Sequence, residues 1–149
     1  MKKAVITLIA LLSLVACIPN SGQSAEIDEA VLLVTIGDIQ ETFVLEDLQS
    51  LPSEDVSFNG VFYKGVRMST LLEVVSVNPD TLKALKAVAT DGYSVNYDPT
   101  QILKDNVLVA YALADGSSLS ADDGNYRMVL PDEGGKLNLR MLAELEILQ

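Results

Sequence analysis

From residue 31 onward, the chain alternates between hydrophobic and polar residues in the manner of paired β-strands. Residues 31–36 are rich in β-branched and aliphatic side chains, residues 40–44 alternate, and the turn-forming pair Gly37-Asp38 separates them. This arrangement predicts a β-hairpin. Leucines then recur at every third position over residues 45–51, which predicts one or two helical turns closed by Pro52.

The remainder of the chain continues as short strands with few helices. Asn59-Gly60, a strong hairpin turn signal, separates strands predicted at residues 56–58 and 61–63. Residues 69–75 predict a short helix for which Ser69 is the expected N-cap. Further strands are expected at residues 85–90, 93–97, 107–112, 126–130 and 141–148. The pattern predicts an α+β fold, with a mostly-β mixed sheet and short helices over it.

The first residues are typical of an export signal. Lys2 and Lys3 precede an apolar run over residues 4–14, which is far shorter than the ~20 residues that span a bilayer as a helix. The signal ends in Leu-Val-Ala followed by Cys17, which resembles the lipobox of bacterial lipoproteins, where cleavage precedes a cysteine that carries lipid. The alternative interpretation is an ordinary signal peptide with an incidental cysteine.

This interpretation divides the chain into three parts. Residues 1–16 are the signal peptide, residues 17–29 are the lipidated Cys17 and a flexible tether, and residues 30–149 are the folded domain. The protein would be exported and lipid-anchored to the bacterial membrane, facing the periplasm or the cell exterior. Because Ile18 stands where an aspartate would retain many Gram-negative lipoproteins in the inner membrane, the outer membrane is favoured if the organism is Gram-negative.

Composition excludes several kinds of function. The chain has no histidine, which excludes a His-based triad or a His-ligated metal site, and its single cysteine excludes an intrachain disulfide. The formal charge is −11, and without the two lysines of the signal the 21 acidic side chains face eight basic ones, a charge of −13. Nucleic acid is therefore not an expected partner, because its phosphates require clustered Lys and Arg.

Five segments of the domain follow one another in the order of a known set of motifs. The motifs are an aromatic-x-Gly-Val followed by Leu-Leu, an Asp-Gly-Tyr, an apolar strand before Asp-Gly-x-x-Leu, a Gly-x-x-Arg with three apolar residues and proline, and a closing apolar strand. The segments are residues 63–73, 91–99, 108–119, 124–131 and 140–147. Together they resemble the molybdopterin-binding domain of sulfite-oxidase-type oxidoreductases, and the likeness runs from about residue 31 to residue 148. The resemblance implies a stand-alone domain of that fold.

The resemblance also implies a molybdopterin cofactor, whose molybdenum is bound by a cysteine thiolate in the segment before the aromatic-x-Gly-Val motif. Here that segment, residues 53–62, contains no cysteine. The cofactor phosphate calls for cations, and before the last strand only Lys64, Arg67 and Arg127 lie in or beside the motifs. We therefore expect no cofactor to be bound, and the resemblance alone keeps molybdopterin as the alternative.

A small polar or anionic ligand is the other candidate for the same cleft. The residues expected to line it combine cations, turn residues and polar side chains: Lys64, Arg67, Asp91, Tyr93, Asn96 and Arg127. Two interpretations of Arg127 stay open, because a guanidinium in an apolar strand can pair with a nearby carboxylate or can clamp an anionic ligand. No catalytic residue is expected, and no metal ligand, because Asp115, Asp122 and Asp123 lack the order of a calcium-binding loop.

Three functions are consistent with these observations. The first is a membrane-tethered binding or accessory module that recognises a small ligand or an envelope protein partner. The second is a genuine molybdopterin-dependent oxidoreductase, or a subunit of one. The third is a structural envelope lipoprotein. The missing cysteine favours the first, so we expect the protein not to be an enzyme of the redox kind.

Overall fold

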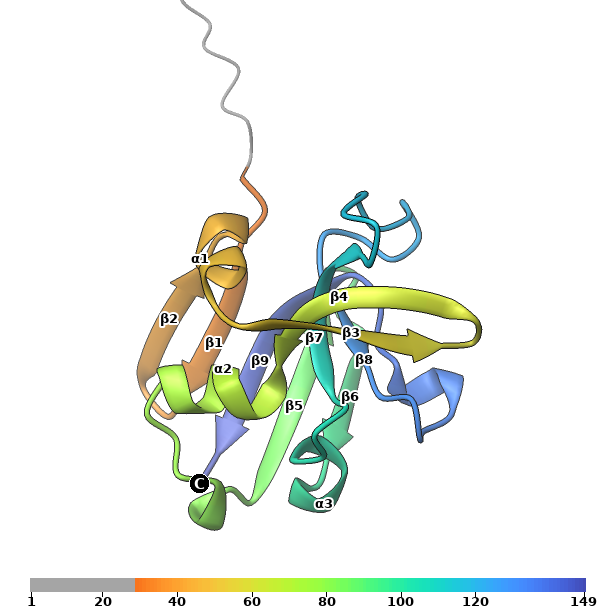
Figure 1. The fold of residues 1–149 in the computed structure, drawn as a ribbon. Helices are drawn as coiled ribbons and strands as arrows, with labels where there is room; N and C mark the ends of the chain where they lie inside the picture. The colour runs from red at the N-terminus through yellow and green to blue at the C-terminus, as the bar shows by residue number, and fades with distance from the viewer. Residues whose placement is uncertain (1–28) are drawn as a thin grey trace, which may run out of the picture.

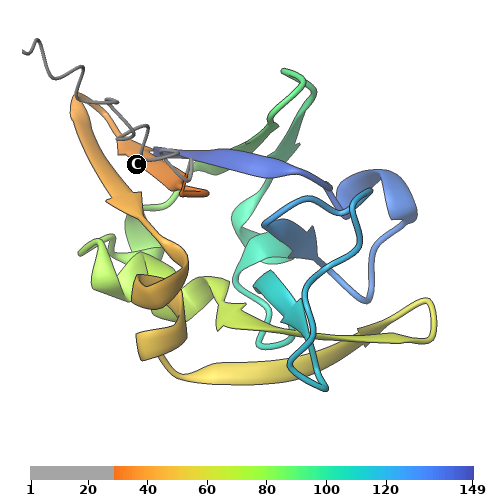
Figure 2. The ribbon, with the colours of Figure 1, turned by 90° about the horizontal axis from the view of Figure 1, so that it is seen from above.

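The strands of the domain form two separate β-sheets rather than one (Figure 1). The computed structural model describes residues 29–149, so the predicted signal peptide, Cys17 and nearly all of the tether lie outside the described residues. The sheets lie on opposite sides of the molecule in the view from above (Figure 2). Strand β9 (Leu142–Leu148) belongs to one sheet, and the hairpin of β3 (Ser53–Phe58) and β4 (Val61–Arg67) belongs to the other. The expected mostly-β α+β fold is confirmed.

The five-stranded sheet has the order β2-β1-β9-β5-β6. The first two strands form the predicted hairpin, and β9 then pairs in parallel with β1 and in antiparallel with β5. The sheet is therefore mixed, as the sequence predicts. Its strands are β1 (Leu32–Ile36), β2 (Ile39–Phe43), β5 (Ala84–Ala89), β6 (Ser94–Tyr97) and β9 (Leu142–Leu148).

The four-stranded sheet has the order β3-β4-β7-β8 and is antiparallel throughout. The predicted Asn59-Gly60 turn joins β3 to β4, and both residues have positive φ, which a two-residue hairpin of this kind requires. A register shift falls between Lys64 and Gly65. The strands are β3 (Ser53–Phe58), β4 (Val61–Arg67), β7 (Leu108–Leu113) and β8 (Arg127–Val129).

The helices are short: α1 (Leu45–Ser50), α2 (Met68–Val74), α3 (Pro99–Ile102), and the 3₁₀ turns η1 (Pro79–Thr81) and η2 (Gly135–Leu137). The prediction that Ser69 caps α2 is wrong, because the helix begins one residue earlier, directly after Arg67. The Met68 N–H donates to the carbonyl of Val107 (2.9 Å), which lies just before β7. A backbone carbonyl therefore satisfies the first N–H of the helix in place of a side-chain cap. None of the helices in residues 29–149 has both the length and the apolar character needed to cross a membrane.

The main hydrophobic core lies where the sheets and α2 meet. Leu71 and Leu72 of α2 are 1% and 0% exposed, and they belong to the same buried cluster as Val66 of β4 and Leu145 of β9. A second, smaller cluster of buried residues includes Tyr63, Leu108, Ala110 and Val129, all in the four-stranded sheet.

Candidate functional site

Two of the three expected ligand-binding cations are held by carboxylates of the neighbouring strand. Lys64 Nζ lies 3.1 Å from Asp55 Oδ1, and Arg67 Nη2 lies 2.6 Å from Glu54 Oε1. These are pairs between β3 and β4, at the outer edge of the four-stranded sheet. Their charges are therefore already balanced within the protein.

Arg127 is buried rather than open to a ligand. Its Nη1 lies 2.6 Å from Asp123 Oδ1 and also donates to the hydroxyl of Tyr63 (2.8 Å). The guanidinium carbon sits 4.5 Å from the centre of the Tyr63 ring, a cation–π contact. The hydroxyl of Ser120 donates to the second Asp123 oxygen (2.9 Å). Of the two interpretations of Arg127, the structure has the one in which it pairs with an acidic residue.

The remaining candidates lie in and after the turn between β5 and β6. Asp91 accepts a hydrogen bond from the backbone N–H of Tyr93 (2.9 Å), which fixes the turn, and Tyr93 is 54% exposed. Asn96 is exposed on β6 opposite Lys86 of β5. Asp91 and Tyr93 line a common hollow, whereas Asn96, Lys64, Arg67 and Arg127 do not line it.

This hollow has a volume of about 540 Å³, within the range of about 300–1,000 Å³ that is usual for small-molecule sites. It lies between the β5–β6 turn and the chain that enters β9, because β5 pairs with β9 and the Thr90 N–H donates to the Met141 carbonyl (2.9 Å). Three of its charged lining residues, Asp122, Lys136 and Arg140, were not among the expected ligand-binding residues. The hollow therefore combines charges of both signs with one exposed aromatic ring.

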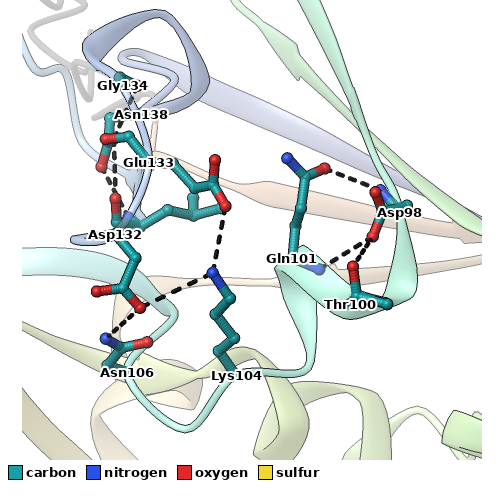
Figure 3. Close-up of polar contacts among 10 residues, drawn as sticks. Asp98, Thr100, Gln101, Lys104, Asn106, Asp132, Glu133, Gly134 and Asn138 are labelled. Carbon is teal, nitrogen blue, oxygen red and sulfur yellow. Dashed lines mark hydrogen bonds and ion pairs between the residues drawn. The ribbon is translucent and has the colours of Figure 1, made fainter.

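A set of polar contacts fixes the connection that carries two of these charges, residues 130–141 between β8 and β9 (Figure 3). Lys104, just after α3, reaches Asp132 (3.8 Å) and Glu133 (3.2 Å) at the start of the connection. The buried Asn138 accepts from the Leu130 N–H (2.7 Å) and donates to the carbonyls of Leu130, Glu133 and Gly134. We call these contacts the clasp. The clasp joins the connection to itself and to Lys104.

The short helix α3, which lies beside the clasp, begins with a capping motif that is visible in the sequence. Asp98 accepts from the Gln101 N–H (3.1 Å), and the Gln101 side chain accepts from the Asp98 N–H (3.1 Å), a capping box with proline at the first helical position. The hydroxyl of Thr100 also donates to Asp98, and this bond and the backbone N–H bonds lower the pKa of the Asp98 carboxyl. The carboxylate therefore stays charged in its capping role.

Two buried tyrosines secure the edges of the domain. Tyr126 donates to the carbonyl of Ala30 (2.8 Å) at the start of the domain, and burial, followed by the charges of Glu46, Glu29 and Asp47, raises its pKa to about 12. Tyr97 donates to the Leu137 carbonyl (2.6 Å), and burial raises its pKa well above the usual value. Both hydroxyls thus remain protonated donors at neutral pH.

The side chains described between residues 29 and 149 do not fit molybdenum chemistry. They include no thiol, and among them no three His, Cys, Asp or Glu residues are grouped as a metal site. Asp115 is engaged by the N–H and hydroxyl of Ser117, and Asp123 by Arg127. Lys64, Arg67 and Arg127, the cations of the motifs before the last strand, each lie within 3.1 Å of a carboxylate and are not free for a phosphate.

Comparison with known protein families identifies the family of this domain. The oxidoreductase molybdopterin-binding domain matches residues 37–149, about three quarters of the chain. This chain belongs to that family. Among the curated proteins, no sequence matches it.

A solved structure that the chain resembles is the sulfane dehydrogenase SoxCD from Paracoccus pantotrophus, with a TM-score of 0.66 and 21% sequence identity. The match covers 79% of this chain and 38% of that chain, so this member of the family spans less than half the length of its structural relative. The likeness confirms the sulfite-oxidase-like fold. In the structure of this chain, the aromatic-x-Gly-Val segment lies on β4 and the Asp-Gly-Tyr segment forms the turn that lines the hollow.

Proposed function

We propose that this protein is a lipid-anchored binding or accessory module of the bacterial cell envelope that does not carry out molybdenum redox chemistry. The observation that carries the proposal is the buried pair of Arg127 and Asp123, 2.6 Å apart. A guanidinium that is almost wholly enclosed and already bonded to a carboxylate and to Tyr63 has no free face for a cofactor phosphate.

The chemistry of the ligands supports the same conclusion. Molybdenum in this fold would need a soft thiolate, and the only cysteine of the chain is Cys17. On our interpretation, lipid modification uses that thiol at the N-terminus. Lys64 and Arg67 also form ion pairs with Asp55 and Glu54. On this proposal, the family's motifs here maintain the fold without the cofactor's contacts.

The anchor itself is tested by lipid labelling. The full chain and a Cys17→Ser variant are expressed in a bacterium that processes lipoproteins, with labelled palmitate in the medium. We expect label and signal cleavage in the unchanged chain and neither in the variant. Label in both proteins would refute the anchor.

We assign the binding role to the hollow beside Tyr93. It is large enough for a small molecule, charged groups of both signs line it, and the clasp braces one of its walls. A small polar or anionic ligand fits these features better than a large cofactor that needs several free cations. Its occupancy by such a ligand would make the protein a receptor or accessory subunit for an envelope process.

The main competing function is a genuine molybdopterin-dependent oxidoreductase, which family membership favours. The two are separated by activity measurements on protein made in a host that synthesises molybdopterin. We expect no sulfite- or sulfoxide-linked electron transfer by this protein. A molybdenum-loaded family member made in the same host serves as the positive control and should show such activity. Turnover above the host background would refute the accessory role.

A further inference from the structure

Nearly all positive charge in residues 29–149 is neutralised by neighbouring groups. Of the eight basic side chains, six lie within 4.0 Å of a carboxylate, and the ammonium of Lys83 donates to the Gln149 carbonyl (2.9 Å). Such pairing is expected in a chain with a large excess of acidic residues. The exceptions to it are therefore informative.

The two basic side chains that are least neutralised both line the hollow. Lys136 is exposed and makes no ion pair or side-chain hydrogen bond with any residue from 29 to 149. Arg140 is 61% exposed and approaches only Asp123, through Nε at 3.5 Å, and that carboxylate is already held by Arg127 at 2.6 Å. The outer nitrogens of Arg140 thus remain available. Two incompletely neutralised cations line one cavity of this acidic protein.

The same hollow also presents unneutralised negative charge. Asp122 is exposed and forms no ion pair within the described part of the chain, and Asp91 engages only the N–H of Tyr93. Tyr93, 54% exposed, follows Asp91 by two residues in the turn and lines the same hollow. A hollow that offers both a carboxylate and an open aromatic ring suits an ammonium group, which the ring attracts through its quadrupole.

We propose that the hollow binds a small zwitterion of the amino acid or short-peptide type. Its carboxylate pairs with Lys136 and Arg140, and its ammonium group lies against Asp91, Asp122 and Tyr93. This inference rests on the proposed function and names its ligand class. The clasp around Asn138 braces the backbone of the connection that carries both cations, which reduces the backbone ordering needed on binding.

The test uses the full-length chain in a maltoside detergent and three probes: triglycine, N-acetyltriglycine and triglycine amide. Each cap removes one of the two charges and leaves the rest of the probe nearly unchanged. Dissociation constants come from nuclear magnetic resonance titration. We expect triglycine to bind and each capped form to bind at least about tenfold more weakly, as expected for the loss of a charge-assisted hydrogen bond. Absence of triglycine binding, or binding of either capped form as tight as that of triglycine, overturns the proposal.

Two variants locate the site, and a third serves as the matched control. Lys136→Gln and Arg140→Gln should each weaken triglycine binding at least about tenfold. Lys83→Gln, which removes the same charge at the opposite end of β5, should leave it unchanged. Unchanged binding by Lys136→Gln refutes the assignment. Molybdenum is measured in the same preparation: metal-free protein that fails to bind triglycine refutes the zwitterion alone, whereas stoichiometric molybdenum refutes the proposed function itself.

Discussion

Arg127 Nη1 lies 2.6 Å from Asp123 Oδ1, and their side chains are only 3% and 9% exposed. The pair joins β8 to the loop before it and packs against the ring of Tyr63 on β4. It is the most deeply buried ion pair among residues 29–149. We therefore regard it as a structural element of the four-stranded sheet.

Replacing Arg127 by methionine should destabilise the protein by about 3 kcal/mol, because the change leaves Asp123 buried without its main partner. Chemical denaturation measures the effect. The matched control is Arg67→Met, whose pair with Glu54 is partly exposed and should be worth less than about 1 kcal/mol. The double variant with Asp123→Leu should recover part of the loss. Equal losses at positions 127 and 67 would contradict a structural role for the buried pair.

Gly65 should not tolerate a side chain. A Cβ atom there would lie 2.2 Å from the Val109 carbonyl oxygen and 2.6 Å from Ala110 Cα, both in the backbone of β7. Overpacking typically lowers the free energy of unfolding by about 1–3 kcal/mol. We expect Gly65→Ala to lower it by about 3 kcal/mol or more, because backbone atoms must move. Gly134→Ala, which meets nothing within 4 Å, is the control and should change the stability by less than about 0.5 kcal/mol. Wild-type stability of Gly65→Ala would show that β4 and β7 are less closely packed.

Stability should decline in alkaline solution as tyrosines ionise. The pKa of Tyr126 is raised from 10.0 to about 12 in the folded protein, so between these values the folded state keeps a proton that the unfolded state loses. The stabilisation is present below pH 10 and is lost as the pH rises toward 12. Thermal unfolding of the wild type and Tyr126→Phe from pH 9 to 11.5 measures it.

The phenylalanine variant should show a smaller decline than the wild type. Part of the decline should remain, because burial also raises the pKa of Tyr97. Identical pH profiles for the two proteins would mean that burial and the neighbouring carboxylates do not raise the pKa of Tyr126 in solution.

Most of the strands were predictable because local signals determine them. The Asn59-Gly60 turn and the alternation around Gly37 specify two hairpins without reference to the rest of the chain. The helix α3 was missed although Asp98-Pro99 and Gln101 carry a recognisable capping pattern. The division into two sheets was not predictable, because pairings such as β1 with β9 join residues more than a hundred positions apart.

The candidate site was predicted only in part for the same reason. Asp91 and Tyr93 were recognised from their turn motif, and the structure brings them into the hollow. Lys136 and Arg140 join them only because β9 pairs with β5, a contact that periodicity does not reveal. The partners of Lys64 and Arg127 likewise depend on the folded arrangement, since carboxylates are frequent throughout this acidic chain.

The most direct test of the account is the molybdenum content of the purified full-length protein. The chain is made in a host competent for molybdopterin synthesis, a molybdenum-loaded family member is made in parallel, and metal per chain is measured by mass spectrometry. We predict substoichiometric molybdenum in this protein and full loading of the control. Molybdenum near one atom per chain, with an electron paramagnetic resonance signal on partial reduction, would contradict the account and identify a working redox site.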